Sequence, residues 1–202
     1  MISPVSPVSP VPPEPCLSPA DRQPSNPRAR YSDAAIAFHW LLALMIIGSF
    51  SFGVYMSDLP FSPSRIKQFN WHKWAGITIL ALSALRLLWR LTHRPPPLDL
   101  VKTWQTLAAD ATHWLMYGLF FAIPLAGWAY SSAAGFPVVY FGVLSLPDWV
   151  DKNADLADQL KLLHKILAFS LAAVVALHVA AAAKHQWFDK DRLMDRMNPF
   201  VR

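Results

Sequence analysis

The chain of 202 residues contains little charge and a single cysteine. Only 15% of its residues are Asp, Glu, Lys or Arg, against about 25% in an ordinary soluble domain, which argues against a soluble enzyme. Cys16 has no second cysteine to pair with, so the sequence is not that of a disulfide-stapled secreted domain. The glycine patterns of phosphate-binding and dinucleotide-binding loops are missing as well, and we expect no nucleotide cofactor.

Apolar and aromatic residues are abundant instead. Hydrophobic residues make up 54% of the chain and aromatic residues 13%, and the mean hydropathy is +0.28. A net charge of +5 would suit nucleic acid, but in a chain this apolar we expect Lys and Arg in the loops that orient membrane helices. The composition predicts an integral membrane protein in a lipid bilayer, with no nucleic-acid partner.

The sequence divides into a tail and a membrane domain. Residues 1–30 are rich in Pro and Ser, which predicts a disordered tail because dense proline prevents a continuous helix. Residues 31–199 contain four apolar segments, and about 20 residues suffice to cross a bilayer. We expect membrane helices at about 34–57, 71–91, 107–131 and 160–183. The apolar stretch 135–150 contains two prolines and predicts an interfacial loop resting on the bilayer.

The basic residues predict the orientation. Of the 18 Lys and Arg residues, 12 belong to the side of the tail, the second loop and the C-terminus, and 6 belong to the opposite side. Cytoplasmic loops carry the excess of Lys and Arg in membrane proteins. The expected fold class is therefore all-α, a four-helix transmembrane bundle with an N-in/C-in topology.

Two histidines of the fourth segment have an informative spacing. His164 and His178 are 14 residues apart, which brings them back to nearly one face of a helix and separates them by about 21 Å along its axis. Ionisable residues inside membrane segments are candidates for a functional site, because an unpaired polar group is costly there. One helix thus presents an imidazole near each membrane surface.

Depth in the bundle selects partners for these two imidazoles. His39 lies near the cytoplasmic start of the first helix and matches His178, whereas His72 lies at the outer start of the second helix and matches His164. Imidazole is a common ligand of haem iron, and helix bundles build cofactor sites from facing side chains. The pattern predicts two bis-histidine b-type haems. Alternatively, the histidines bind a bare metal or only join the helices of a non-redox membrane protein.

Three further residues are candidates near the inner pair. Arg86 shares a helix face with His72 at the inner level, where it would bind a haem propionate or simply extend to the headgroups. His113 competes with His39 as inner ligand, or it meets water and headgroups. His185 either lines a quinone pocket or acts as an interfacial residue together with Trp187.

Two glycines belong to the same helix faces. Gly53 lies at the level of the outer pair, and Gly76 follows His72 by one turn. Both would let a porphyrin edge approach the backbone, although glycine is also frequent in membrane helices for packing alone.

Several short motifs follow one another along the chain in an order and spacing that match a known family. They are RYS…FHW, HKWAG, RLLWRL before PPP, THWLMYGLF, LHKIL and ALHVAAAAKH. Over about residues 30–199 the chain thereby resembles the bacterial cytochrome b561 proteins. The resemblance implies a multi-pass protein of the bacterial inner (cytoplasmic) membrane, with four helices and two haems b. It assigns His39 and His178 to the inner haem, His72 and His164 to the outer haem, and His185 to the quinone pocket.

The resemblance also suggests a function. The family includes a superoxide oxidase, which passes electrons from superoxide to ubiquinone, and we expect a quinone-coupled oxidoreductase of this kind. Bis-histidine ligation leaves no open position on iron, so the chemistry would be outer-sphere electron transfer. The alternative is an electron-carrier cytochrome b subunit that serves a periplasmic donor or a dehydrogenase.

Overall fold

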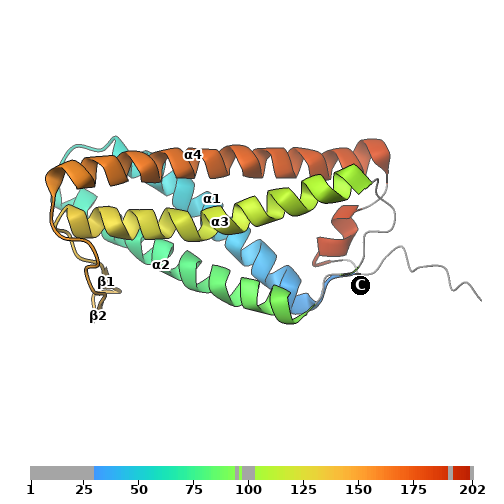
Figure 1. The fold of residues 1–202 in the computed structure, drawn as a ribbon, viewed down its shortest axis with the longest axis horizontal. Coiled ribbons are helices and arrows are strands. Elements are labelled where there is room, and N and C mark those ends of the chain that lie inside the picture. Colours follow the sequence, from blue (N-terminus) through green and yellow to red (C-terminus); the bar gives the residue numbers. More distant parts are fainter. Residues whose placement is uncertain (1–29, 94–95, 97–102, 191–192, 201–202) are drawn as a thin grey trace, which may run out of the picture.

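The computed structural model describes residues 30–93, 96, 103–190 and 193–200. Four long helices form an elongated bundle: α1 (Asp33–Ser57), α2 (Pro63–Thr92), α3 (Thr103–Ala133) and α4 (Ala154–Lys184) (Figure 1). Each of the four expected helical ranges falls inside one of them. The proline-rich tail expected at residues 1–30 lies outside the described residues except for Arg30.

Side-chain caps explain where the helices begin. The hydroxyl of Ser32 accepts a hydrogen bond from the Ala35 amide at the start of α1. Ser62 does the same at the start of α2, where Pro63 occupies the first turn, a position that suits its fixed φ and missing N–H. We expected α2 to begin near residue 71, because the apolar pattern starts there. The preceding residues of the helix are mostly polar and do not show in that pattern. Asn153 caps α4, which likewise begins before residue 160.

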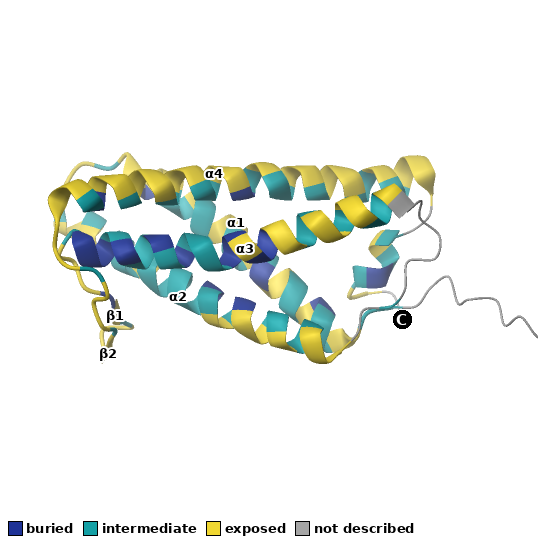
Figure 2. Cartoon of the chain, viewed as in Figure 1, coloured by how far each residue is buried: buried dark blue, intermediate teal, exposed yellow. Residues whose placement is uncertain are grey.

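The helix α3 contributes most of the core cluster of the bundle. It packs extensively on α4 and also on α2, and α1 packs mainly on α2. The core cluster consists of Met116, Tyr117, Leu119 and Phe120 from α3 and Leu171 from α4. Figure 2 shows buried residues along the half of α3 nearer the hairpin and exposed residues along the outer side of α4. By contrast, α1 and α4 share few contacts among the described residues.

Three of the helices are apolar enough to cross a membrane by length and composition. They are α1, α2 and the continuous stretch Ala154–Asp189, which extends α4 by a π-helical turn, η1 (His185–Asp189). We expected α3 to be a fourth span, but within the described part of the chain it does not reach the same standard. Its packing offers a physical reason, because α3 contacts both α2 and α4 and supplies most of the core cluster, so it needs less apolar surface toward lipid.

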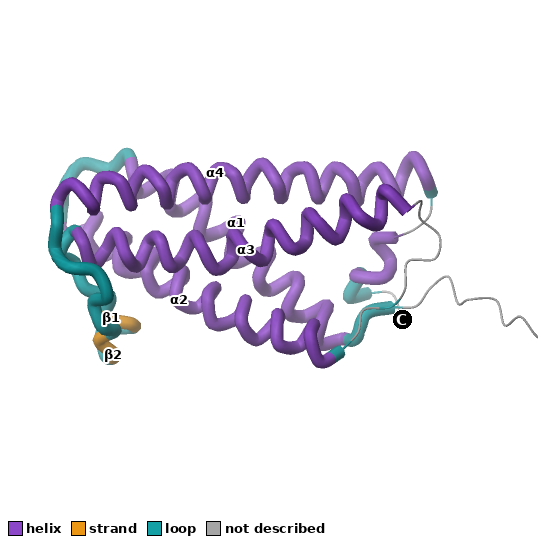
Figure 3. Tube along the Cα trace, viewed as in Figure 1, coloured by secondary structure: helices purple, strands orange, loops and turns teal. Residues whose placement is uncertain are grey.

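A small antiparallel hairpin interrupts the expected loop at 135–150. Its strands are β1 (Val139–Tyr140) and β2 (Leu144–Ser145), with Val139 opposite Ser145 and Tyr140 opposite Leu144. The hairpin projects sideways from the end of the bundle where α3 ends and α4 begins (Figure 3). The sequence did not reveal it, since strands of two residues are too short to show an alternating pattern.

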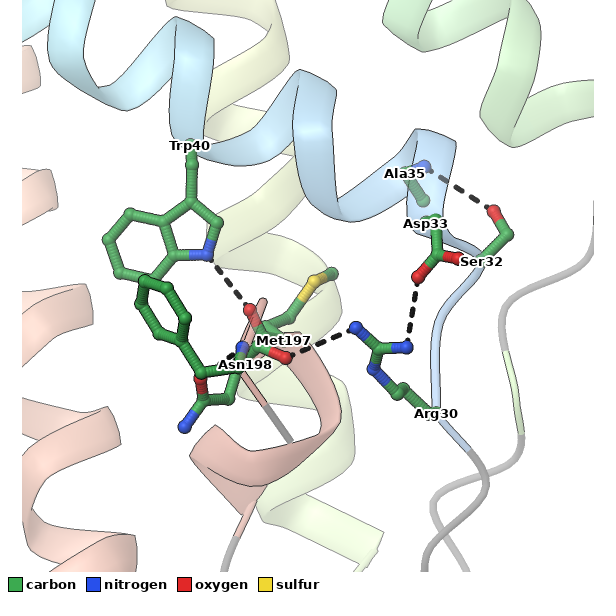
Figure 4. A network of polar contacts seen from close by, with 8 residues as sticks. Arg30, Ser32, Asp33, Ala35, Trp40, Met197 and Asn198 are labelled. Atoms are coloured by element: carbon green, nitrogen blue, oxygen red, sulfur yellow. Dashed lines mark hydrogen bonds and ion pairs between the residues drawn. The ribbon is translucent and has the colours of Figure 1, made fainter. Parts of the chain in front are cut away.

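The C-terminal segment folds back on the start of α1. A short 3₁₀ helix, η2 (Leu193–Met197), ends beside Trp40, whose indole N–H donates to the Met197 carbonyl at 2.8 Å. Arg30 donates to the Asn198 carbonyl at 3.3 Å and to the Asp33 carboxylate at 2.9 Å (Figure 4). These contacts hold the end of the chain at the end of the bundle where α1 begins.

Candidate functional site

Four predicted histidines meet as two pairs. The ring centres of His39 in α1 and His178 in α4 are 6.4 Å apart. Those of His72 in α2 and His164 in α4 are 6.2 Å apart. These are the pairs that the depth argument predicted, and they lie near opposite ends of α4, separated by about 21 Å of helix. Their role as ligands remains a prediction.

The separation within each pair fits two ligands of one metal. An imidazole nitrogen lies about 2.0–2.1 Å from a bound first-row metal and about 1.2 Å from its own ring centre, so two imidazoles on opposite sides of one metal have centres about 6.4 Å apart. Both observed separations agree with this value. The ring centre of His113 lies only 5.4 Å from that of His178, which is too close for the same arrangement.

The imidazole of His164 is held by α3. Its Nδ1–H donates to the main-chain carbonyl of Ile123 at 2.9 Å. A hydrogen bond of this kind fixes the tautomer of a metal-binding histidine and leaves Nε2 free with its lone pair. Gly127 makes the contact possible, because a Cβ there would lie 3.0 Å from both Cε1 and Nδ1 of His164.

The imidazole of His72 is held by α1 in a similar way. The hydroxyl of Ser49 lies 3.4 Å from His72 Nδ1 and can accept a hydrogen bond from its N–H. A Cβ on Gly53 would lie 3.0 Å from His72 Cε1. Gly53 is therefore at the level of the outer pair as predicted, but in this structure it makes room for a ligand side chain.

A largely apolar cavity opens beside the pair His72 and His164. Its lining includes Phe50, Gly76, Phe120, Pro124 and Leu171. A Cβ built on Gly76 would meet no heavy atom within 4 Å, so this glycine borders open space. Two imidazoles directed by hydrogen bonds, beside an apolar space, fit the ring and the iron of a b-type haem.

The inner pair has a cationic neighbour. The Arg86 guanidinium of α2 lies 3.1 Å from His39 Nδ1 and over the ring of Tyr117 at 5.7 Å. Because a guanidinium only donates, His39 carries its proton on Nε2 in this arrangement. Ligation through Nε2 needs the other tautomer, so Arg86 has to release Nδ1 when His39 binds a metal.

The remaining candidates lie near the same end. His113 contacts His178, so it lies beside the inner pair rather than only among headgroups. His185 opens η1, seven residues beyond His178, with its Nδ1 3.3 Å from an Asp189 carboxylate oxygen. Its side chain is mostly buried, whereas that of Trp187 is 69% exposed.

Sequence reasoning missed three positioning groups of the outer pair: Ser49, the Ile123 carbonyl and Gly127. A signal existed for two of them. Ser49 precedes Gly53 by one helical turn, and Gly127 follows Pro124 by three residues in the same apolar segment. Nothing in the sequence marks the Ile123 carbonyl, since every residue has one.

A bare metal site is poorly supported by the side chains. Among the residues that the structure describes, no group of three or more His, Cys, Asp or Glu is arranged to hold a metal ion. The predicted ligand side chains come in pairs, which suits a metal whose other ligands come from a macrocycle.

Comparisons with known proteins agree with the geometry. Residues 30–199 match the family model of prokaryotic cytochrome b561. Cytochrome b561 homolog 2 of Escherichia coli (strain K12) is 35% identical over 175 residues, which cover 86% of this chain and 93% of the relative. A probable superoxide oxidase, CybB, of Yersinia pestis is 33% identical over 84% of this chain and 96% of its own length.

A second protein of the same Escherichia coli strain, cytochrome b561 homolog 1, is 28% identical over 84% of this chain and 97% of the relative. These matches cover nearly all of the four-helix region. The chain therefore belongs to the prokaryotic cytochrome b561 family of membrane electron carriers, which implies a b-type haem.

Proposed function

We propose that the protein is a superoxide:ubiquinone oxidoreductase with two b-type haems. Two superoxide ions would be oxidised to two molecules of oxygen, and one ubiquinone would take up the two electrons and two protons to become ubiquinol. The observation that carries the proposal is the presence of two histidine pairs, each spaced for one metal, at opposite ends of α4. The similarity to a probable superoxide oxidase supports the choice of substrate.

The proposed topology follows from the charge count and the packing. All four helices cross the bacterial inner membrane, and both termini lie in the cytoplasm. The excess of Lys and Arg on that side supports the orientation. Residues 1–30 then form a cytoplasmic tail ahead of the membrane domain at 31–199.

The histidines hold the cofactors. We assign His72 and His164 to the outer haem and His39 and His178 to the inner haem. Bound haem b would supply reversible one-electron chemistry at each pair. His164 contributes a fixed tautomer through Ile123, and Arg86 contributes a positive charge beside His39. Once Arg86 releases His39, its guanidinium can bind a carboxylate such as a haem propionate.

Cations near the outer end attract the anionic substrate. Lys67 is exposed and is best placed to act on an approaching anion. Lys73 donates to three oxygen atoms at the end of α3, those of Ser131, Phe136 and Pro137, so it contributes to the electrostatic field without contacting the substrate. Such attraction raises the rate of encounter and weakens with salt.

We place ubiquinone at the opposite end, beside His185. This imidazole lies two turns beyond His178 on the same helix and faces the Asp189 carboxylate. An imidazole can both accept and donate a proton, and can therefore pass one to a reduced quinone.

A stopped-flow experiment tests the proposal. Pulses of superoxide should reduce the purified holoprotein, followed in the visible spectrum, and added ubiquinone should restore the oxidised spectrum. Lys67→Glu should slow the reduction at low salt, whereas Lys190→Glu, at the other end of the bundle, should not. A reduction rate no faster than uncatalysed dismutation would overturn the proposal and favour an electron-carrier subunit that needs a protein donor.

A further inference from the structure

The hairpin between α3 and α4 has an unusual composition. Residues 111–147, which include both of its strands, contain no Asp, Glu, Lys or Arg. The side chains that project from it are large and apolar: Phe141 is 61% exposed, Val143 88% and Leu144 58%. An exposed apolar patch of this kind requires a partner surface.

The contacts of the hairpin fix its depth along α2. The indole N–H of Trp74 donates to the Val139 carbonyl at 2.7 Å, and the Tyr140 hydroxyl lies 2.9 Å from that of Thr78. Trp74 is the first residue of a stretch, 74–85, that contains no formal charge, and Lys73 comes directly before it. The strand β1 therefore lies where α2 passes from the charged boundary into its apolar span.

Several backbone carbonyls of the hairpin are hydrogen-bonded within the protein. The Val138 carbonyl accepts from Leu146, and the Tyr140 carbonyl accepts from Val143. Lys73 donates to the carbonyls of Phe136 and Pro137 that lead into β1. Unpaired backbone groups are what normally keep irregular chain out of lipid, and these carbonyls are paired.

The turn supports a role for the Phe141 side chain. Phe141 and Gly142 have φ values of +50° and +73°, a conformation that favours Asn or Gly over an aromatic residue. A phenylalanine at such a position is unfavourable for the backbone by itself. Its ring centre lies 5.1 Å from that of Trp74 and 4.5 Å from that of Tyr140. Phe141 is nevertheless 61% exposed, so a surface outside the chain would bury the rest of the ring.

We propose that the hairpin β1–β2 inserts its turn into the lipid leaflet at the His72 end of the bundle, as an interfacial anchor held against α2. Lipid is the occupant that the observations favour, because the patch continues the lipid-facing surface of α2, where Trp71 is also exposed. The turn and both strands, residues 139–145, carry no charged side chain, as a segment that enters lipid requires. The proposal rests on membrane insertion of the family and does not depend on the superoxide reaction.

Spin-label accessibility tests the proposal on the full-length holoprotein. In a Cys16→Ser background, a nitroxide is attached to Val143→Cys or to Leu144→Cys, and the protein is reconstituted in nanodiscs of phosphatidylcholine and phosphatidylglycerol. Both labels should collide several-fold more with oxygen than with a water-soluble nickel chelate. Leu177→Cys, exposed on α4, serves as the lipid control, and Asp151→Cys, exposed in the same connection, serves as the water control.

Two outcomes would overturn the proposal. Labels at 143 and 144 that meet the nickel chelate as readily as the label at 151 would place the turn in water. Labels shielded from both reagents would mean that protein covers the turn, including a second copy of this chain. An unchanged haem spectrum in each variant shows that the fold is intact.

Discussion

The Nδ1–H of His164 donates to the carbonyl of Ile123, and this bond of 2.9 Å joins α4 to α3 at the outer histidine pair. The accepting carbonyl belongs to the peptide bond before Pro124. Pro124 has no N–H to donate to the Phe120 carbonyl one turn earlier, and α3 continues through it. The helix α3 thus helps to orient the imidazole of His164, although α3 itself supplies no predicted ligand to this pair.

Removal of one outer ligand should halve the haem content. We expect His164→Ala to bind about one haem per chain where the parent protein binds two, because the inner pair stays intact. Pyridine haemochrome analysis of the purified protein measures the stoichiometry. His93→Ala is the matched control, since His93 stacks on Trp89 at 3.8 Å near the end of α2. Retention of two haems by His164→Ala would contradict the assignment.

Two glycines of α3 should respond differently to the same substitution. In Gly127→Ala the new Cβ meets His164 at 3.0 Å, and this imidazole cannot move without losing its bond to Ile123. We expect a cost of about 1–3 kcal/mol in stability and weaker binding of the outer haem. Gly118→Ala meets nothing within 4 Å and should be neutral or gain up to about 1 kcal/mol from helix propensity.

Thermal unfolding in detergent, with haem release monitored in the visible spectrum, compares the two alanine variants. Equal melting temperatures for Gly118→Ala and Gly127→Ala would show that the close approach of His164 to Gly127 does not affect stability.

His39 and His113 are distinguished by their distances to His178. The separation of 6.4 Å permits one metal between His39 and His178, and that of 5.4 Å does not for His113. We therefore expect His39→Phe to lose the inner haem and His113→Phe to keep both haems. The opposite result, from haem stoichiometry and the reduced spectrum, would make His113 the ligand.

The charge of Arg86 should raise the midpoint potential of the inner haem. A nearby cation stabilises the reduced form, so Arg86→Gln should lower the potential by roughly 1–2 kcal/mol, or about 40–90 mV for one electron. Arg90→Gln, one turn along α2, is the control, because Arg90 faces Trp114 and Tyr117 at 5.9 Å. Spectroelectrochemical titration measures both potentials, and equal shifts would show that the position of Arg86 beside the inner pair has no particular effect.

The C-terminal segment should loosen when its indole contact is lost. Trp40→Phe keeps the aromatic ring and removes the hydrogen bond to the Met197 carbonyl, which typically contributes about 0.5–1.5 kcal/mol. Hydrogen exchange of residues 193–198 should accelerate accordingly. Trp104→Phe, an exposed position at the start of α3, is the control, and unchanged exchange in Trp40→Phe would show that other contacts hold η2.

The family, the apolar segments and the pairing of the four histidines were predictable from the sequence. A span in lipid requires about 20 apolar residues, and residues 14 apart on a helix share a face. Both are properties of a single helix, so they can be read before any packing is known. The expected ranges accordingly fall within α1, α2, α3 and α4.

Tertiary structure alone decided which groups surround the histidines. That Gly53 supports His72, that Gly127 and Ile123 position His164, and that Arg86 contacts His39 all depend on how each helix is rotated against its neighbours. Hydropathy does not specify these rotations, because any face of an apolar helix can face lipid. The hairpin and the return of η2 to α1 are likewise contacts between distant parts of the chain, which no local pattern encodes.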